Sequence, residues 1–122
     1  MANTLSSEDS LKSELVSWAK AHRFSNIKAN LEGHEAPTAY SKPGEDTPYV
    51  PDVTGVKLGH KSYFEVALKS EDAERAIRKW KLLSTLAEMR NGNLYLFAPK
   101  GHKAFVSNVV KERNLKATVV SI

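Results

Sequence analysis

The chain has 122 residues, of which 41% are hydrophobic and 26% charged, and its formal net charge is +4. These values are typical of a single globular domain that is large enough to bury its own core. The absence of cysteine excludes a disulfide framework, a thiolate zinc site and a cysteine nucleophile. The mild excess of positive charge favours a polyanionic partner such as nucleic acid.

Two features bear on where the protein acts. No apolar run approaches the roughly 20 residues of a membrane span. The polar start, Met1 to Ser10, carries Glu8 and Asp9 and does not resemble a secretory signal. We therefore expect a cytoplasmic protein with no membrane partner.

The first third of the chain is expected to form a helix and then a strand. Residues 6–9, Ser-Ser-Glu-Asp, indicate a helix start, because hydroxyl groups cap the first turn and acids favour the positive end of the helix dipole. Large side chains then recur at helical spacing to about Arg23, at Leu11, Leu15, Trp18 and His22. Apolar and polar residues alternate over 27–32, which predicts a half-buried strand.

The middle of the chain is expected to form a loop and a hairpin. The segment from Ala36 to Pro51 inclusive contains four prolines and a glycine, a density that predicts an exposed loop without a regular element. Two β-rich runs follow, Val53–Leu58 and Ser62–Leu68, and Gly59 between them predicts a hairpin turn.

The last third is expected to alternate helices and strands. A long helix is capped by Ser70-Glu71-Asp72 and is ended near Asn91 by a left-handed Gly92. A strand, a helix and a strand are then predicted at residues 94–98, 102–113 and 117–122. The resulting order, α-β-β-β-α-β-α-β, predicts an α/β fold in which an antiparallel meander precedes a crossover unit. The last two strands should be parallel, because a helix connects them.

The long helix carries two apolar stripes. The stripe expected to face the sheet comprises Ala73, Ala76, Ile77, Trp80, Ser84 and Ala87. Leu82, Leu86 and Met89 form a second stripe that is nearly opposite. A helix that is apolar on two sides is expected to be covered on both. The first helix could cover the second stripe within the monomer, and a second subunit could do so in a homodimer.

Asp52 and Glu65 form the most informative constellation. Asp52 precedes the first strand of the hairpin, and Glu65 lies in the second strand, Phe64-Glu65-Val66-Ala67-Leu68-Lys69. Two such carboxylates can converge on one divalent cation, because Mg²⁺ prefers oxygen ligands. A metal bound there would activate water for attack on a phosphodiester. A nearby lysine would stabilise the charge that develops on the phosphate.

Pro51-Asp52, the hairpin and an acid within an apolar strand, after an amphipathic helix, resemble the PD-(D/E)xK nuclease superfamily. The element order supports the resemblance over nearly the whole chain, whereas the motif covers only residues 51–69. The resemblance implies a single restriction-endonuclease-like domain over 1–122 that uses Mg²⁺ or Mn²⁺ on DNA. It implies that Asp52 and Glu65 bind the metal, with Glu14 as a further ligand, and that dimers are common.

The chain departs from the family at the motif lysine. That position holds Ala67, and Lys69 lies two residues further along the same predicted strand face. Some branches of the family recruit a lysine from the following helix instead, and Lys79 is the first candidate there, because it flanks the core face of that helix; Lys81 is the next. The protein is thus either a Mg²⁺-dependent endonuclease with a displaced lysine or a catalytically inactive DNA-binding or assembly module. An unrelated α/β interaction domain is the third alternative.

Four basic residues other than the candidate catalytic lysines are candidate contacts to nucleic acid. His60 and Lys61 lie at the hairpin turn, and Lys100 and Lys103 precede and begin a predicted helix, where phosphate groups can bind. Each candidate also has an ordinary interpretation. A solvated turn explains the four basic residues, a turn acid explains Asp52, and an edge strand would accommodate Glu65.

Overall fold

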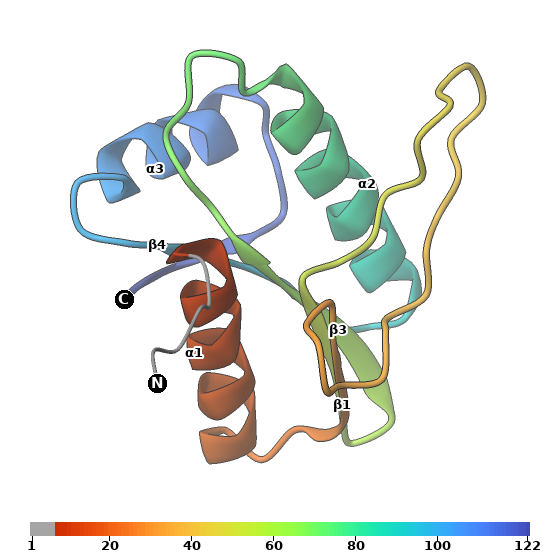
Figure 1. Cartoon of the computed structure of the whole chain (residues 1–122). Coiled ribbons are helices and arrows are strands. Elements are labelled where there is room, and N and C mark those ends of the chain that lie inside the picture. Colours follow the sequence, from red (N-terminus) through yellow and green to blue (C-terminus); the bar gives the residue numbers. More distant parts are fainter. Residues whose placement is uncertain (1–6) are drawn as a thin grey trace.

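The computed structural model describes residues 7–122, which form three helices and a five-stranded sheet (Figure 1). The helices are α1 (Ser7–Ala21), α2 (Glu74–Met89) and α3 (Lys103–Glu112). The strands are β1 (Ser25–Ala29), β2 (Val53–Lys57), β3 (His60–Val66), β4 (Leu94–Ala98) and β5 (Thr118–Ser121). The predicted order of elements and the mixed α/β fold are confirmed.

The five strands lie side by side in the order in which they occur in the chain. β1, β2 and β3 pair antiparallel, whereas β4 pairs parallel with both β3 and β5. A helix, α2 or α3, joins each parallel pair, because parallel neighbours need a crossover connection. The predicted meander and the parallel pairing of the last two strands are therefore both confirmed.

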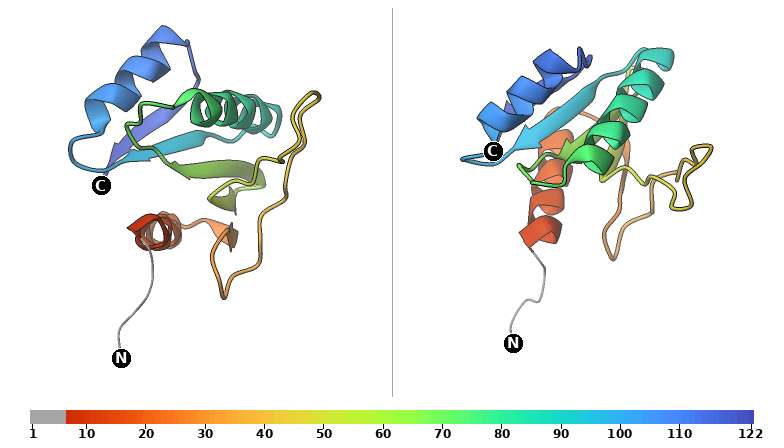
Figure 2. Two further views of the ribbon diagram at one scale, coloured as in Figure 1. Left: turned by 45° about the horizontal axis from the view of Figure 1, so that its top comes forward. Right: turned by 90° about the horizontal axis from the view of Figure 1, so that it is seen from above.

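The helices cover both faces of the sheet (Figure 2). α2 and α3 lie on one face, where Trp80 and Val106 pack with Leu96 of β4. α1 lies on the other face, where Leu15 packs in a core with Phe64 of β3. The first helix therefore cannot cover the second apolar stripe of α2, and that alternative is wrong.

The second apolar stripe of α2 is only partly exposed. Leu82 and Leu86 are half-buried, and Leu86 packs against the core beneath α2, while Met89 is 72% exposed. The first stripe faces the core as predicted, through Ala73, Ile77, Trp80 and Ala87. The apolar surface that favoured a second subunit is thus smaller than the sequence pattern indicates. The homodimer stays a prediction.

The start of α1 agrees with its sequence signals. Glu8 and Asp9 lie in its first turn and Lys20 in its last, so the charges complement the helix dipole. Ser6, the other hydroxyl of the predicted cap, lies outside the described residues. Within residues 7–122, none of the helices has the length and apolar character that spanning a bilayer requires.

Both ends of α2 differ from the predicted boundaries. The helix starts after the predicted cap, because Ser70 Oγ accepts the N–H of Asp72 and forms a turn ahead of it. At the other end the left-handed residue is Asn91, with φ of 58°, and not Gly92. Gly92 is needed for a close approach, since a Cβ there would lie 1.7 Å from the carbonyl oxygen of Lys61. The turn after α2 therefore packs directly on β3.

The proline-rich loop before β2 contains no helix or strand, as predicted, but it is not simply exposed. Tyr40 and Tyr49 form an isolated antiparallel bridge within it, and Tyr49 is buried. Arg75 of α2 lies over the Tyr49 ring, 4.1 Å from its centroid, and donates to the carbonyl oxygens of Thr47 and Pro48. The loop, yellow in Figure 1, is thereby fastened to α2 just before the chain enters β2.

Candidate active site

Asp52 and Glu65 face each other where β2 begins and β3 ends. The register pairs Val53 with Phe64, so Asp52, one residue before β2, lies opposite Glu65. Phe64 belongs to the α1 side of the sheet, and side chains alternate along a strand, so Glu65 belongs to the α2 side. Both acids are buried, with 9% and 2% of their surface exposed. The structure thus brings the two predicted acids together.

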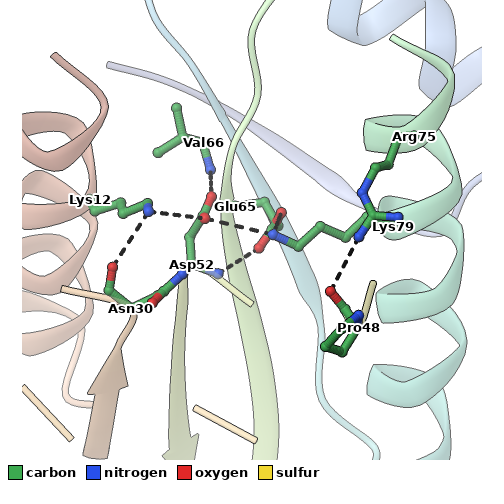
Figure 3. Close-up of polar contacts among 8 residues, drawn as sticks. All are labelled: Lys12, Asn30, Pro48, Asp52, Glu65, Val66, Arg75 and Lys79. Atoms are coloured by element: carbon green, nitrogen blue, oxygen red, sulfur yellow. Dashed lines mark hydrogen bonds and ion pairs between the residues drawn. The ribbon is translucent and has the colours of Figure 1, made fainter. Parts of the chain in front are cut away.

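Each carboxylate is held by one hydrogen bond from the backbone of the opposite segment (Figure 3). The N–H of Asp52 donates to Oε2 of Glu65 over 2.7 Å, and the N–H of Val66 donates to Oδ2 of Asp52 over 2.9 Å. These bonds fix the orientation of both side chains. The other two carboxylate oxygens, Oε1 of Glu65 and Oδ1 of Asp52, accept no backbone hydrogen bond and can interact with a cation.

Lys79 of α2 is the cation nearest to those two oxygens. Its Nζ lies 3.0 Å from Oε1 of Glu65 and 3.7 Å from Oδ1 of Asp52 (Figure 3). Lys12 of α1 approaches Oδ1 of Asp52 from the opposite side at 3.9 Å, and its Nζ also donates to the carbonyl oxygen of Asn30. Lys79 was predicted from its place beside the core face of its helix. No sequence signal pointed to Lys12.

Burial and the neighbouring charges shift the pKa values of Glu65 and Lys79. Burial and, secondarily, the neighbouring carboxylate of Asp52 raise the pKa of Glu65 to about 8, although Lys79 and the Asp52 N–H oppose the rise. Burial lowers the pKa of Lys79, but the carboxylates of Glu65 and Asp52 outweigh burial and raise it. Near neutral pH the acid pair therefore retains a proton while Lys79 is charged. Such perturbed groups cluster at functional sites.

The acids open into a pocket of about 430 Å³ between α1, the end of β3 and α2. Glu8, Lys69 and Asp72 are further charged residues of its lining, and Trp80 contributes apolar surface. In the sequence, Glu8 and Asp72 are recognisable only as acids at helix starts. Their place in the pocket depends on how α1 and α2 pack around β3, which local sequence does not indicate.

Lys69 does not lie where the motif predicted it. β3 ends at Val66, so Lys69 is not on the strand face that carries Glu65, and this expectation is wrong. The Lys69 backbone instead turns toward α3 and donates its N–H to Nδ1 of His102 over 2.8 Å. Ala67, at the motif lysine position, is fully buried in the core. Lys79, rather than a lysine of the strand, therefore reaches the acids.

Glu14 and Lys81 are not brought to the acid pair. Glu14 is exposed on α1 and lines a separate hollow with Trp18. Lys81 is exposed on α2. Residues two apart in a helix differ in direction by about 200°, so Glu14 points away from Lys12, and Lys81 from Lys79. The expected third metal ligand of the first helix is thus displaced from the site.

The four predicted nucleic-acid contacts lie outside the acid pocket. His60 is exposed at the start of β3, and Lys61 beside it is half-buried, with Nζ 3.3 Å from the hydroxyl of Tyr40. Lys100 lies in the turn before α3, and Lys103 is the first residue of that helix; both are exposed. None of the four therefore lines the pocket that holds Asp52 and Glu65.

The donor set at the site suits a hard divalent cation. Asp52 and Glu65 each have one carboxylate oxygen that accepts no backbone hydrogen bond and faces the lysines, and Mg²⁺ is commonly bound by one or two carboxylates with water and substrate phosphate. Within residues 7–122 no group of three or more histidine, cysteine, aspartate or glutamate residues could hold a metal ion. A metal here would therefore depend on these two acids and would compete with the ammonium group of Lys79.

Comparison with known protein families, curated proteins and solved structures finds no match for this chain. The site itself consists of two buried carboxylates with fixed orientations and a lysine that reaches both.

Proposed function

We propose that the chain is a metal-dependent nuclease with a restriction-endonuclease-like fold of the PD-(D/E)xK type, and that it hydrolyses phosphodiester bonds in DNA. The meander followed by a crossover helix and a parallel strand supports this fold. The observation that carries the proposal is the meeting of Asp52, Glu65 and Lys79 in one pocket. Glu65 is buried with a raised pKa beside Asp52 and Lys79, and titratable groups perturbed in this way cluster at functional sites.

Asp52 and Glu65 are the residues that would hold Mg²⁺ or Mn²⁺. When bound, the metal would activate a water molecule and neutralise charge on the scissile phosphate. The backbone bonds from Asp52 and Val66 keep one oxygen of each carboxylate occupied, so the chain presents the other oxygens in a fixed position. Preorganisation of this kind lowers the reorganisation needed during the reaction.

Lys79 would act on the substrate rather than on the metal. Hydrolysis joins a water oxygen to phosphorus and breaks one P–O ester bond, and the leaving oxygen takes up a proton. Charge builds on the phosphoryl oxygens during this step, and the Lys79 ammonium group is placed to donate to one of them. Lys79 reaches the acids from α2, so it would take the role of the motif lysine, whose position in the strand is occupied by Ala67.

A catalytically inactive DNA-binding or assembly module is the second candidate. The 3.0 Å contact between Lys79 and Glu65 favours it, because a protein cation already compensates the acids in the absence of metal. In that case the three residues form a structural ion-pair network, and breaking one partner would chiefly destabilise the fold.

Cleavage assays separate the two candidates. Supercoiled, single-stranded and branched DNA are incubated with Mg²⁺ or Mn²⁺ and either wild type, Asp52→Asn, Glu65→Gln or the exposed control Glu14→Gln. We expect cleavage by wild type and the control, and a loss of at least about 10²-fold in the two site variants. DNA binding without cleavage by any form would favour the inactive module. Equal cleavage by all variants would contradict the assigned site.

A further inference from the structure

A second pocket, of about 200 Å³, lies at the far end of α2 from its first turn. It is lined by Asn26, Lys28, Thr54, Gly55, Val56, Lys61 and Arg90. Three of these residues are cations, and none is an acid. This basic pocket is separate from the acid pocket, with which it shares no lining residue.

The sheet and α2 bring the cations together. Lys28 of β1 pairs with Thr54 of β2, and Val56 of β2 pairs with Lys61 of β3. Paired residues and alternate residues of a strand share a face, so these four side chains lie on the α2 side of the sheet. The turn after α2 packs directly on β3, which places Arg90 beside them.

Two polar groups of the pocket lack a hydrogen-bond partner among the described residues. Within residues 7–122, the Arg90 guanidinium forms no hydrogen bond or ion pair. Thr54 is 2% exposed, and its hydroxyl likewise has no hydrogen-bond partner in the described chain although the residue lines the pocket. Lys28 pairs only with the exposed carboxylate of Glu35, at 3.4 Å, and such surface pairs contribute little.

This donor set fits an oxyanion. Three like charges around a small hollow repel one another, and an anion between them removes that repulsion. Guanidinium and ammonium groups bind phosphate through charge-assisted hydrogen bonds, and the hydroxyl of Thr54 and the amide of Asn26 add neutral donors.

We propose that the basic pocket binds a backbone phosphate of the DNA strand that reacts at the acid pair, an inference that rests on the proposed function. Lys79 and Arg90 are eleven residues apart, about three helical turns, so they lie on one side of α2 roughly 16 Å from each other. Along β2, Asp52 and Val56 are roughly 13 Å apart. Phosphates on one strand of a duplex are spaced by about 3.4 Å along the axis. The basic pocket is thus four or five nucleotides from the reacting phosphate.

Titration with inorganic phosphate, followed by amide NMR at constant ionic strength, tests the pocket without DNA. We expect shifts concentrated at Asn26, Gly55 and Lys61, and an affinity about tenfold lower in Arg90→Gln. The matched control is Lys111→Gln, which removes an exposed charge of α3 and should leave the titration unchanged. Shifts scattered over the surface, or an Arg90→Gln affinity equal to wild type, would overturn the inference.

DNA binding, measured by fluorescence anisotropy in EDTA, tests the role of the pocket. The double variant Lys28→Gln/Arg90→Gln should lower the slope of log Kd against log salt by about two and weaken binding at least about tenfold. If wild type binds phosphate in the pocket but cleaves no DNA, the proposed function fails and the oxyanion site stands. If wild type cleaves DNA and the double variant keeps the salt slope, the pocket inference fails and the proposed function stands.

Discussion

The backbone N–H of Asp52 donates to the side chain of Glu65 over 2.7 Å, across thirteen positions of the chain. The carboxylate that is proposed to bind metal thus also ties the start of β2 to the end of β3. Removal of the whole side chain would leave a buried donor without a partner, which costs about 1–3 kcal/mol regardless of chemistry. Amide substitutions keep an acceptor oxygen and are therefore the informative variants at this site.

Metal affinity should rise with pH up to about 8. Glu65 retains its proton below its raised pKa of about 8, and a divalent cation must displace that proton to bind. Isothermal titration with Mn²⁺ in buffers of different ionisation enthalpy should therefore detect the release of about one proton at pH 7 and little release above pH 9. A pH-independent affinity, with no proton release, would contradict the assignment of Glu65 as a ligand.

Glu65→Gln should make stability less dependent on pH. Because the folded pKa of Glu65 lies above its ordinary value of 4.5, the stability that the protonated acid confers is present below 4.5 and is lost as pH rises through about 8. Wild type should thus lose more unfolding free energy than Glu65→Gln between pH 6 and pH 9 in urea titrations. Glu14→Gln is the exposed control, and it should follow wild type. Parallel curves for Glu65→Gln and wild type would refute the raised pKa.

Lys79→Met should lower kcat by about 10²-fold or more while DNA affinity changes little, because the ammonium group would act only on charge that develops during the reaction. Lys81→Met on the opposite side of α2 is the matched control. Lys69→Ala should have a smaller effect, since that residue lies beyond the end of β3 at the pocket lining. Full activity in Lys79→Met would show that the displaced-lysine hypothesis is wrong.

Arg75→Met should loosen the proline-rich loop. Arg75 holds the loop through Glu45, Thr47, Pro48 and the ring of Tyr49, only a few residues before Asp52. We expect a stability loss of about 1 kcal/mol, because part of the side chain is solvated, together with faster proteolysis within the loop.

Lys81→Met is the control for the loop, because Lys81 is exposed on α2, whereas Arg78 itself contacts the loop through the Glu45 carboxylate, at 3.7 Å, and through Tyr49. Limited proteolysis with mass spectrometry locates the first cuts. Identical cleavage rates in wild type and Arg75→Met would mean that Arg75 does not fasten the loop.

Much of the fold could be predicted because the local patterns agree with the packing. The meander, the crossover and the parallel final strands follow from strand periodicity and from connection length. Glu65 was identifiable because a glutamate is unusual inside an apolar strand, and Lys79 because it borders the core face of its helix. Each of these signals depends only on residues that are close together in the chain, so each can be recognised without the structure.

The remaining parts of the site depend on long-range packing. Lys12 pairs with Asp52, and Glu8 lines the pocket, only because α1 packs next to Asp52, and the same orientation turns Glu14 away. Lys69 was misplaced because β3 ends before it, at the point where the chain turns toward His102. The prolines predicted an exposed loop. Tyr49 within it is nevertheless buried, because it packs against Arg75 of α2, which lies 26 residues further along the chain.

Anomalous diffraction from crystals soaked in Mn²⁺ above pH 8 tests most directly whether Asp52 and Glu65 form a metal site. At this pH the Glu65 carboxylate is ionised, so competition from its proton is removed. We predict one strong anomalous peak between the two carboxylates, with Lys79 moved away from Oε1 of Glu65. Crystals soaked in the same way that show no peak there, with Lys79 still bonded to Glu65, would contradict the metal-dependent nuclease.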